Sequence, residues 1–541
     1  MIPSLRVLLL PLLFLLCSRA GAQPDVPRER RSIEGGREYW MTFQRNFRGY
    51  RDVSNGKFSH LVLDSSLRLS LSITSAVMAR GYAEIAGSGH RVPFTVPAGE
   101  MITIPIDPAA LVESSDTVER RAVHLVADAP VIVYGTCHRY QSTETFIAYP
   151  VEDLGNSYRA SCFGPLDRDL TAQVALVGTE DGTRVTITPT AGIARTVPTG
   201  LAITFPRSRL SASDTVRRGA PQRKPGRNKR RRLDSLVTAV LSRVDSSTTQ
   251  EVMMTFRQID TVTVSRPASL PYTIVLNRGD VYQLIARSAG SYTAIHGGKD
   301  SADLTGTSIL SDRPIAVFSG HICAYVPDPS AKACNLLVEQ LPPADAWGRT
   351  FYVADLARHY PSLVRVTASR DSTHIHRNGT LVATLGAGRF YQQRLDSAEI
   401  LTADFPVLVA QIGYGSRGLW GDGVDTLGDP MMLLVAPVEQ YASAYRFMTP
   451  EAGSWHSYIT VLAPTASLGS LRLDGISIDT GLFRRFSDGL YSRAAVAVDR
   501  GAHFITGSSP FGLYLYGFGY GADNYDAYGN AGGYMIPDSG K

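Results

Sequence analysis

Four cysteine residues are spaced so that they could form two disulfide bonds. The chain has five cysteines, and Cys17 lies in an apolar N-terminal stretch. The other four, Cys137, Cys162, Cys323 and Cys334, allow three pairings. Proximity in sequence favours Cys137 with Cys162 and Cys323 with Cys334, and each bridge would add roughly 2–4 kcal/mol of stability. An all-cysteine zinc site would need paired CxxC spacing, which this sequence lacks.

A second candidate site is the basic run RRGAPQRKPGRNKRRRL, from Arg217 to Leu233. The wider stretch from Pro206 to Leu233 holds eleven Lys or Arg and one acid, a net charge of +10; the whole chain is +5, so the remainder is −5. Like charges interspersed with Pro and Gly predict an extended loop.

Arginine pairs with phosphate and sulfate, so this loop is expected to bind polyanions such as acidic polysaccharide, lipopolysaccharide or extracellular DNA. No aromatic residue is interleaved, which argues against stacking on bases. The alternative is a solvated spacer without function. The residues expected to bind are Arg217, Arg218, Arg223, Lys224, Arg227, Lys229, Arg230, Arg231 and Arg232.

Two short sequences match functional motifs but also fit turns. Arg278-Gly279-Asp280 spells an integrin-binding tripeptide, and a hairpin turn would also place glycine there. Gly428-Asp429-Pro430 matches the self-cleavage sequence of von Willebrand type D domains, except that Met431 stands where that sequence has histidine. Because Asp and Pro both favour turns, we interpret both stretches as turns.

The remaining candidate ligands and catalytic groups are isolated. His374 and His376 alternate on a predicted strand, but no third metal ligand accompanies them. Glu152, Glu339 and Glu439 occur at one place of a repeat as single carboxylates, unlike the alternating acids of a calcium loop, and are expected to cap loop amides. The motifs GxSxG, HExxH and GxxxxGK[ST] are absent from the sequence. We therefore predict no enzymatic activity, no cofactor and no metal.

The N-terminus indicates export. Arg6 precedes the apolar run Val7 to Cys17, and Ala20-Gly21-Ala22 supplies the small residues of a signal-peptidase site. We predict a signal peptide over residues 1–22 and a mature chain that is secreted or held at the cell surface. No other segment approaches about 20 apolar residues, so no integral membrane segment is expected after signal removal.

A fourfold repeat organises the rest of the chain. The runs VIVYG, IAVFSG, VLVAQIG and FGLYLYG follow Pro130, Pro314, Pro406 and Pro510. Such runs are typical of strands buried on both faces. Proline lacks an amide donor and would fit the first residue of each strand. Each proline strand is expected at an equivalent central position in one of four β-units.

Other short sequence motifs recur around these strands. They include aromatic strands such as GREYWMTF, turn-and-strand phrases such as TEDGTRVTITP, and glycine turns such as VPAGEMITIPI. No stretch shows sustained helical periodicity. The predicted fold class is all-β, with four repeated antiparallel β-sandwich-like units; propeller-like closure is the alternative.

We place the four units at residues 36–150, 151–341, 342–436 and 437–541. The second unit is longer than the others. Pro314 lies 131 residues after Thr183, whereas in the third unit the equivalent Pro406 lies 33 residues after Thr373. The excess predicts an insertion over residues 190–271 that contains the basic run.

These phrases resemble the N-terminal domain family of IgGFc-binding proteins. The resemblance rests on GREYWMTFQRNF, AVHLVADAPVIVYG, STETFIAYPVEDLGNSY, DLTGTSILSDRPIAVFSGHICAYVP, CNLLVEQLPPADAWGRTFYV and GDPMMLLVAPVEQY, which stand in the family's order across about residues 36–530. It implies an extracellular binding or adhesive module. The basic insertion departs from the family pattern, and no cysteine-rich von Willebrand type D repeats follow, so IgG binding is not carried over.

Three functions remain in competition. The first is a secreted, non-catalytic binding or adhesion module that recognises an extracellular glycan or glycoprotein. The second is a structural protein that self-associates in an extracellular matrix or cell envelope. The third is an exported hydrolase of unrecognised type. A long insertion in one unit only favours the first function, because a lattice protein should keep the surfaces of its units equivalent.

Overall fold

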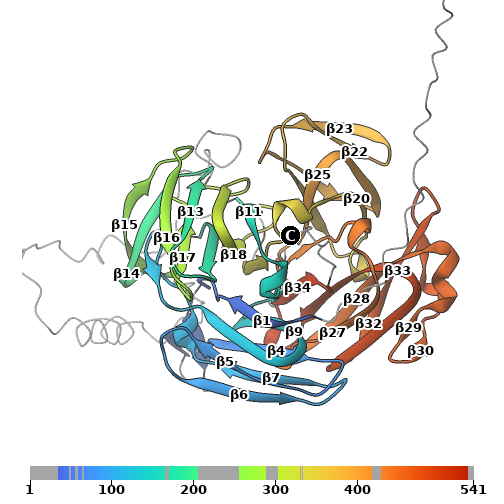
Figure 1. Cartoon of the computed structure of the whole chain (residues 1–541), viewed down its shortest axis with the longest axis horizontal. Helices are drawn as coiled ribbons and strands as arrows, with labels where there is room; N and C mark the ends of the chain where they lie inside the picture. Colours follow the sequence, from blue (N-terminus) through green and yellow to red (C-terminus); the bar gives the residue numbers. More distant parts are fainter. Residues whose placement is uncertain are drawn as a thin grey trace, which may run out of the picture.

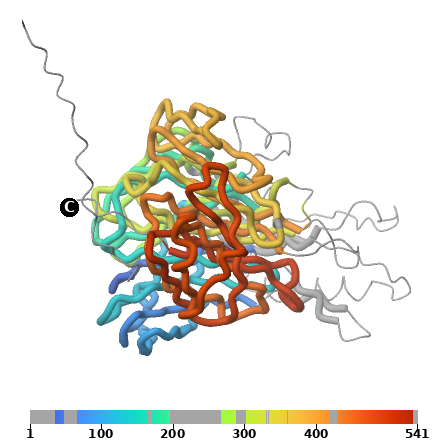
Figure 2. Tube along the Cα trace, turned by 90° about the vertical axis from the view of Figure 1, so that its right-hand side faces the viewer, coloured from blue at the N-terminus to red at the C-terminus, as the bar shows by residue number. Residues whose placement is uncertain are grey.

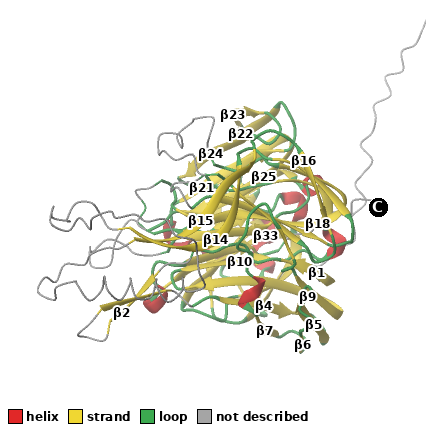
Figure 3. Cartoon of the chain, turned by 90° about the vertical axis from the view of Figure 1, so that its left-hand side faces the viewer, coloured by secondary structure: helices red, strands yellow, loops and turns green. Residues whose placement is uncertain are grey.

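The computed structural model describes residues 35–47, 50–54, 59–63, 66–164, 170–204, 255–287, 302–328, 331, 333–416 and 428–533. The predicted signal peptide and the basic run lie outside these residues. Strands make up nearly all of the regular structure, and the described helices are of 3-10 type and only three to six residues long (Figure 3). The predicted all-β class is confirmed.

Each of four units is built on one long strand. These are β9 (Val123–Arg139), β18 (Ser308–Ala324), β25 (Glu399–Gly413) and β33 (Ala502–Gly519). The first half of each strand pairs with one set of neighbours and the second half with another, so two four-stranded halves share the long strand. In the first half of each long strand, more and less buried side chains alternate. In the second half, every side chain is buried.

Seven strands recur in the same order in every unit. Unit 1 contains β1 (Gly36–Met41), β4 (Arg68–Thr74), β5 (Ala79–Ile85), β6 (Arg91–Val96), β7 (Met101–Ile106), β9 and β10 (Ser142–Ile147). Unit 2 contains β11 (Gly155–Arg159), β12 (Ala172–Gly178), β13 (Thr183–Thr188), β16 (Tyr272–Leu276), β17 (Val281–Ile285), β18 and β19 (Asn335–Gln340), and β8 (Val118–Glu119) pairs with β17.

Unit 3 contains β20 (Gly348–Val353), β21 (Ser362–Ala368), β22 (Thr373–Arg377), β23 (Thr380–Leu385), β24 (Phe390–Leu395), β25 and β26 (Met432–Leu434). Unit 4 contains β27 (Ala442–Met448), β28 (Trp455–Pro464), β29 (Arg472–Leu473), β30 (Ile476–Ser477), β32 (Tyr491–Val498), β33 and β34 (Ala527–Ala531), and β31 (Arg484–Arg485) extends its sheet. The pairings between the described strands are antiparallel, as in β1 with β9 and β4 with β9. The division of the chain into domains at residues 36–150, 151–341, 342–436 and 437–541 remains a proposal.

The four repeated prolines lie within the long strands, not at their first residues as the sequence predicted. In unit 1, Gly36 pairs with Val131 and Glu38 pairs with Val126, so the strand bulges between these pairs. Pro130 occupies this bulge, where no ladder hydrogen bond from its nitrogen is needed. The same register shift occurs beside Pro314, Pro406 and Pro510. The apolar pattern before each proline was too short to show that the strand had already begun.

A tyrosine fixes the bulge in three of the four units. In unit 2 the hydroxyl of Tyr158 accepts from the backbone N of Gly155 at 2.9 Å and donates to the carbonyl O of Ile315 at 2.8 Å. Tyr39 and Tyr445 make the same pair of contacts in units 1 and 4. Unit 3 has Phe351 at this place, so its bulge lacks the hydroxyl.

The four units surround a common centre (Figure 1). Unit 4 lies between unit 1 and unit 3, which Figure 2 shows from the side. A turn of each unit contacts its predecessor. Gly279 of unit 2 has φ +80°, and a Cβ there would lie 2.4 Å from Cβ of Ala86 in unit 1. In unit 4, Asp488 accepts a hydrogen bond of 2.6 Å from the Tyr352 hydroxyl of unit 3. These contacts join unit 1 to unit 2 and unit 3 to unit 4 within the ring of sandwich-like units.

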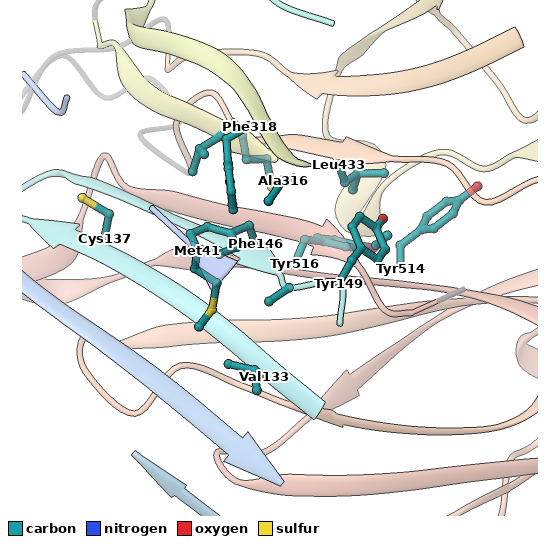
Figure 4. Close-up of a cluster of buried hydrophobic side chains, with 14 of the residues drawn as sticks. Met41, Val133, Cys137, Phe146, Tyr149, Ala316, Phe318, Leu433, Tyr514 and Tyr516 are labelled. Carbon is teal, nitrogen blue, oxygen red and sulfur yellow. The ribbon is translucent and has the colours of Figure 1, made fainter. Parts of the chain in front are cut away.

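The apolar core continues from one unit to the next. The rings of Phe146 in unit 1 and Phe318 in unit 2 lie 5.1 Å apart, and both side chains are fully buried. Figure 4 shows them beside Met41, with Leu433, Tyr514 and other residues of the later units nearby. Burying one such aromatic side chain contributes about 1.5–3 kcal/mol, so the core stabilises the junctions as well as the units.

Candidate functional site

One of the two predicted disulfides is present. Cys323 and Cys334 are bonded, with Cα atoms 5.2 Å apart, and they connect the end of β18 to the segment before β19. Cys137 and Cys162 are free, so the predicted bridge between them is wrong. Cys137 lies in the core of unit 1, whereas Cys162 packs in unit 2, where its thiol faces the carbonyl O of Gln173. Closeness in sequence failed here because the unit boundary lies between the two residues.

The nine residues predicted to bind polyanions, Arg217, Arg218, Arg223, Lys224, Arg227, Lys229, Arg230, Arg231 and Arg232, lie outside the described residues. The structure describes the chain on both sides of this run. There β14 (Ile193–Thr204) and β15 (Thr255–Arg266) pair as an antiparallel two-stranded sheet of their own. Polyanion binding therefore stays a prediction.

The two motif-like turns are largely buried. Asp280 is 8% exposed, its carboxylate accepts from the backbone N of Asn277 at 2.8 Å, and Gly279 packs on unit 1. This tripeptide is a turn at a contact between units, in which Gly279 and Asp280 are buried and Arg278 is exposed. Asp429 is fully buried, and neither of its carboxyl oxygens has a hydrogen-bond partner in the described chain. Burial and the nearby charge of Asp526 raise the pKa of Asp429 well above its ordinary value.

One of the two histidines and two of the three glutamates, His374, Glu339 and Glu439, make hydrogen bonds within the fold. His374 on β22 pairs through Nδ1 with Oδ2 of Asp404 at 2.7 Å. Glu439, in the 3-10 helix η7 (Val438–Gln440), accepts from the backbone N of Arg349 at 3.1 Å. Glu339 lies on β19 instead, so it does not correspond to Glu439. Within the described ranges no group of three or more His, Cys, Asp or Glu is arranged to hold a metal.

A cleft opens on unit 4 where four chain segments meet. Its volume is about 430 Å³. The lining comes from the end of β27, the start of β28, the turn between β32 and β33, and the residue after β33. The lining residues are Thr449, Pro450, Trp455, His456, Ser457, Tyr458, Ala497, Val498, Asp499, Arg500 and Tyr520.

Stacked aromatic rings form one wall of this cleft. The rings of His456 and Tyr520 lie 4.5 Å apart and nearly parallel, at 29°. Pairing of β28 with β33 places His456 opposite Phe518, which brings Tyr520 alongside. Tyr520 is 46% exposed and His456 is also exposed, so the stack faces solvent. We call this pair the aromatic platform.

Charged side chains form the opposite rim. Asp499 and Arg500 are adjacent in the turn between β32 and β33, and both are exposed. Arg500 donates from Nη2 to the carbonyl O of Gly453 at 2.6 Å. The turn is held by Thr449, whose backbone N donates to Gly501 O at 3.1 Å and whose Oγ1 accepts from Gly501 N at 2.9 Å. The rim thus presents one cation and one anion on a restrained turn.

The sequence interpretation missed this cleft. A signal was available in SWHSY, Ser454 to Tyr458, where two exposed or half-exposed aromatic rings and a histidine open a strand. The partner ring Tyr520 lies more than sixty positions later, and only strand pairing brings it near. No spacing rule in the sequence connects the two segments.

The inner strands β10, β19, β26 and β34 surround the ring centre, where buried polar groups join different units. Glu144 of unit 1 accepts from the backbone N of Met432 in unit 3 at 3.0 Å and of Gly529 in unit 4 at 2.8 Å. Its own neighbour Thr145 supplies a third amide at 3.1 Å. Burial raises the pKa of Glu144 well above its ordinary value, and these three amides oppose that shift. One carboxyl group therefore connects three of the four units.

Asn335 and Asp526 complete these contacts. Nδ2 of Asn335 in unit 2 lies 2.9 Å from each of three carbonyl oxygens, those of Thr143, Pro430 and Ala527, which belong to the other three units. Asp526 accepts from the backbone N and hydroxyl of Thr143 at 2.8 and 2.6 Å. Burial raises the pKa of Asp526 to about 8. Hydrogen bonds of Glu144, Asn335 and Asp526 thus join the four units at the ring centre.

No helix among the described residues is long and apolar enough to span a membrane.

Comparison with known proteins agrees with the resemblance seen in the sequence. A family model described as IgGFc binding protein matches residues 227–517, which is more than half of the 541-residue chain. The human IgGFc-binding protein is 28% identical over 189 residues. That region is 34% of this chain but 3% of the human protein, so the chain spans a small part of this relative. The chain belongs to the IgGFc-binding protein family.

Proposed function

We propose that this protein is a secreted, non-catalytic binding module that recognises an extracellular glycan or glycoprotein. Unequal decoration of the four units supports this proposal. Unit 1 carries an extra ribbon of β2 (Tyr50–Ser54) and β3 (Ser59–Leu63), and unit 2 carries β14 and β15. Strand β2 projects from the ring on the left of Figure 3. Unit 4 carries 3-10 helices and the cleft, while the described part of unit 3 shows neither a ribbon nor these helices between its strands β22 and β24.

Unequal surfaces favour ligand recognition over a self-associating lattice. A protein that polymerises through its repeat would use equivalent patches on successive units. Here the repeat is retained in the buried strands and the tyrosine-fixed bulges, and the surface attachments differ. The name of the human relative also refers to binding.

An array of extracellular glycans and glycoproteins, probed with the purified mature chain, tests the proposal. Saturable binding by a monomeric chain is the expected result. Light scattering over a hundredfold concentration range should run in parallel. Concentration-dependent assembly without array binding would favour the structural alternative, and turnover of an arrayed glycan would favour a hydrolase.

We also propose that the basic run binds polyanions, because nine Lys or Arg stand among the seventeen residues 217–233. Deleting residues 206–233 should abolish retention on heparin at low salt and leave the melting temperature almost unchanged. Equal heparin retention by the deletion variant would reduce the run to a spacer.

A further inference from the structure

We infer that the cleft on unit 4 binds a neutral pyranose sugar, with one face of the sugar ring on the His456–Tyr520 platform and its hydroxyls at Asp499 and Arg500. This inference rests on the proposed binding function and assigns it to one site and one ligand class.

The platform suits a ring with one apolar face. The exposed stack of His456 and Tyr520 offers aromatic area to solvent, and exposed aromatic residues of this kind supply much of the binding energy at recognition sites. A pyranose places several C–H groups on one face, which pack on an aromatic ring, while its hydroxyls point outward along the edge. The cleft volume of about 430 Å³ is within the usual range for small-molecule sites, about 300–1,000 Å³.

The polar rim selects hydroxyl groups. A hydroxyl both donates and accepts hydrogen bonds. Asp499 can accept and Arg500 can donate, and the two are adjacent, so neighbouring hydroxyls of one sugar can satisfy both. A purely apolar ligand would make no hydrogen bond to Asp499 or Arg500 and would displace water from them, and an anionic ligand would meet Asp499. The mixed rim therefore favours an uncharged sugar.

The site is held in place before any ligand arrives. Nε1 of Trp455 donates to the carbonyl O of Ala452 at 2.6 Å, and its ring packs edge-on against Tyr528 at 5.2 Å. The backbone N of Tyr520 donates to Ser454 O at 3.0 Å, and Ser454 N donates to the carboxylate of Asp523 at 2.8 Å. Restraint of both walls lowers the entropy cost of binding.

Methyl glycosides of glucose, galactose, mannose and N-acetylglucosamine at millimolar concentration test the inference on the full mature chain. Saturation-transfer NMR and tryptophan fluorescence report binding, because Trp455 lines the cleft. We expect saturable binding of at least one glycoside, and at least a tenfold weaker affinity in Tyr520→Ala. Leu381→Ala is the matched control, since Leu381 is 51% exposed on unit 3, and it should bind as the parent does.

Three results would overturn the inference. One is the absence of saturable binding of every glycoside to the parent chain. Another is parental affinity in Tyr520→Ala; array binding that survives this change would keep the proposed function and remove the cleft from it. The third is tighter binding of methyl glucuronide than of methyl glucoside, which would contradict the selection of an uncharged sugar. Conversely, a chain that binds nothing on the arrays but binds a glycoside through Tyr520 would keep the cleft as a sugar site and count against the proposed function.

Discussion

The ring centre and the unit 4 cleft use similar polar side chains in opposite ways. At the centre, Glu144 and Asn335 are buried and contact backbone groups of the other units. At the cleft, Asp499 and Arg500 are exposed, and their turn is held by other groups. We therefore expect stability to depend on the centre and ligand binding to depend on the cleft.

The largest effect is expected at the centre from Glu144→Ala. This change leaves the amides of Met432 and Gly529 buried without acceptors, and each unsatisfied group costs about 1–3 kcal/mol. We expect a total loss on the order of 3–5 kcal/mol in the free energy of unfolding, measured with denaturant. Glu144→Gln keeps one acceptor oxygen and should lose less. A loss below about 1 kcal/mol in Glu144→Ala would show that the centre does not lock the ring.

The disulfide should have the next largest effect. Replacing Cys323 and Cys334 with serine removes a bridge over a sequence separation of 11, which should cost about 2–3 kcal/mol. Alkylation under non-reducing, denaturing conditions should label Cys137 and Cys162 but not the bonded pair. Labelling of none of the four would restore the pairing predicted from the sequence.

The centre should also make stability depend on pH. Burial raises the pKa of Asp526 to about 8, above about 3.9 for an aspartate in the unfolded chain. The folded state therefore keeps this proton to a higher pH than the unfolded chain does. The stabilisation that Asp526 contributes is fully present below pH 4 and is lost as pH rises toward 8. The slope from this group is at most about 1.4 kcal/mol per pH unit.

Asp526→Asn should flatten the fall in stability between pH 5 and pH 8, although it also weakens the contacts with Thr143. Thermal unfolding at several pH values measures both effects. An unchanged slope in this variant would assign the pH dependence to other buried acids, such as Glu144, Glu339 or Asp429, whose pKa values are also raised by burial.

A smaller effect distinguishes unit 3 from the other units. Tyr158→Phe removes a hydroxyl that joins Gly155 to Ile315 and should cost about 1 kcal/mol. Phe351→Tyr in unit 3 should raise the free energy of unfolding by a similar amount, because the added hydroxyl would stand at the same place in the bulge. Equal stability of parent and Tyr158→Phe, measured by thermal unfolding, would mean that the bulge is fixed by packing alone.

The sequence predicted the repeat well because the buried halves of the long strands are dense in Val, Ile, Phe and Tyr around Pro130 and its equivalents. It placed those prolines wrongly because a bulge depends on the register of a partner strand such as β1. It missed both the centre and the cleft for a similar reason. Glu144 contacts Gly529, and His456 stacks on Tyr520, only after strands distant in sequence have met.

The smallest effect on stability is expected at the cleft, from Tyr520→Ala. This side chain is nearly half exposed and stacks on the exposed His456, so its removal should change the free energy of unfolding by less than about 0.5 kcal/mol. The same variant should lose sugar binding. Its thermal unfolding curve should therefore overlay that of the parent, while the glycoside titration should not. A loss of several kcal/mol would place the platform among the groups that hold unit 4 together, and the division between a stabilising centre and a binding cleft would fail.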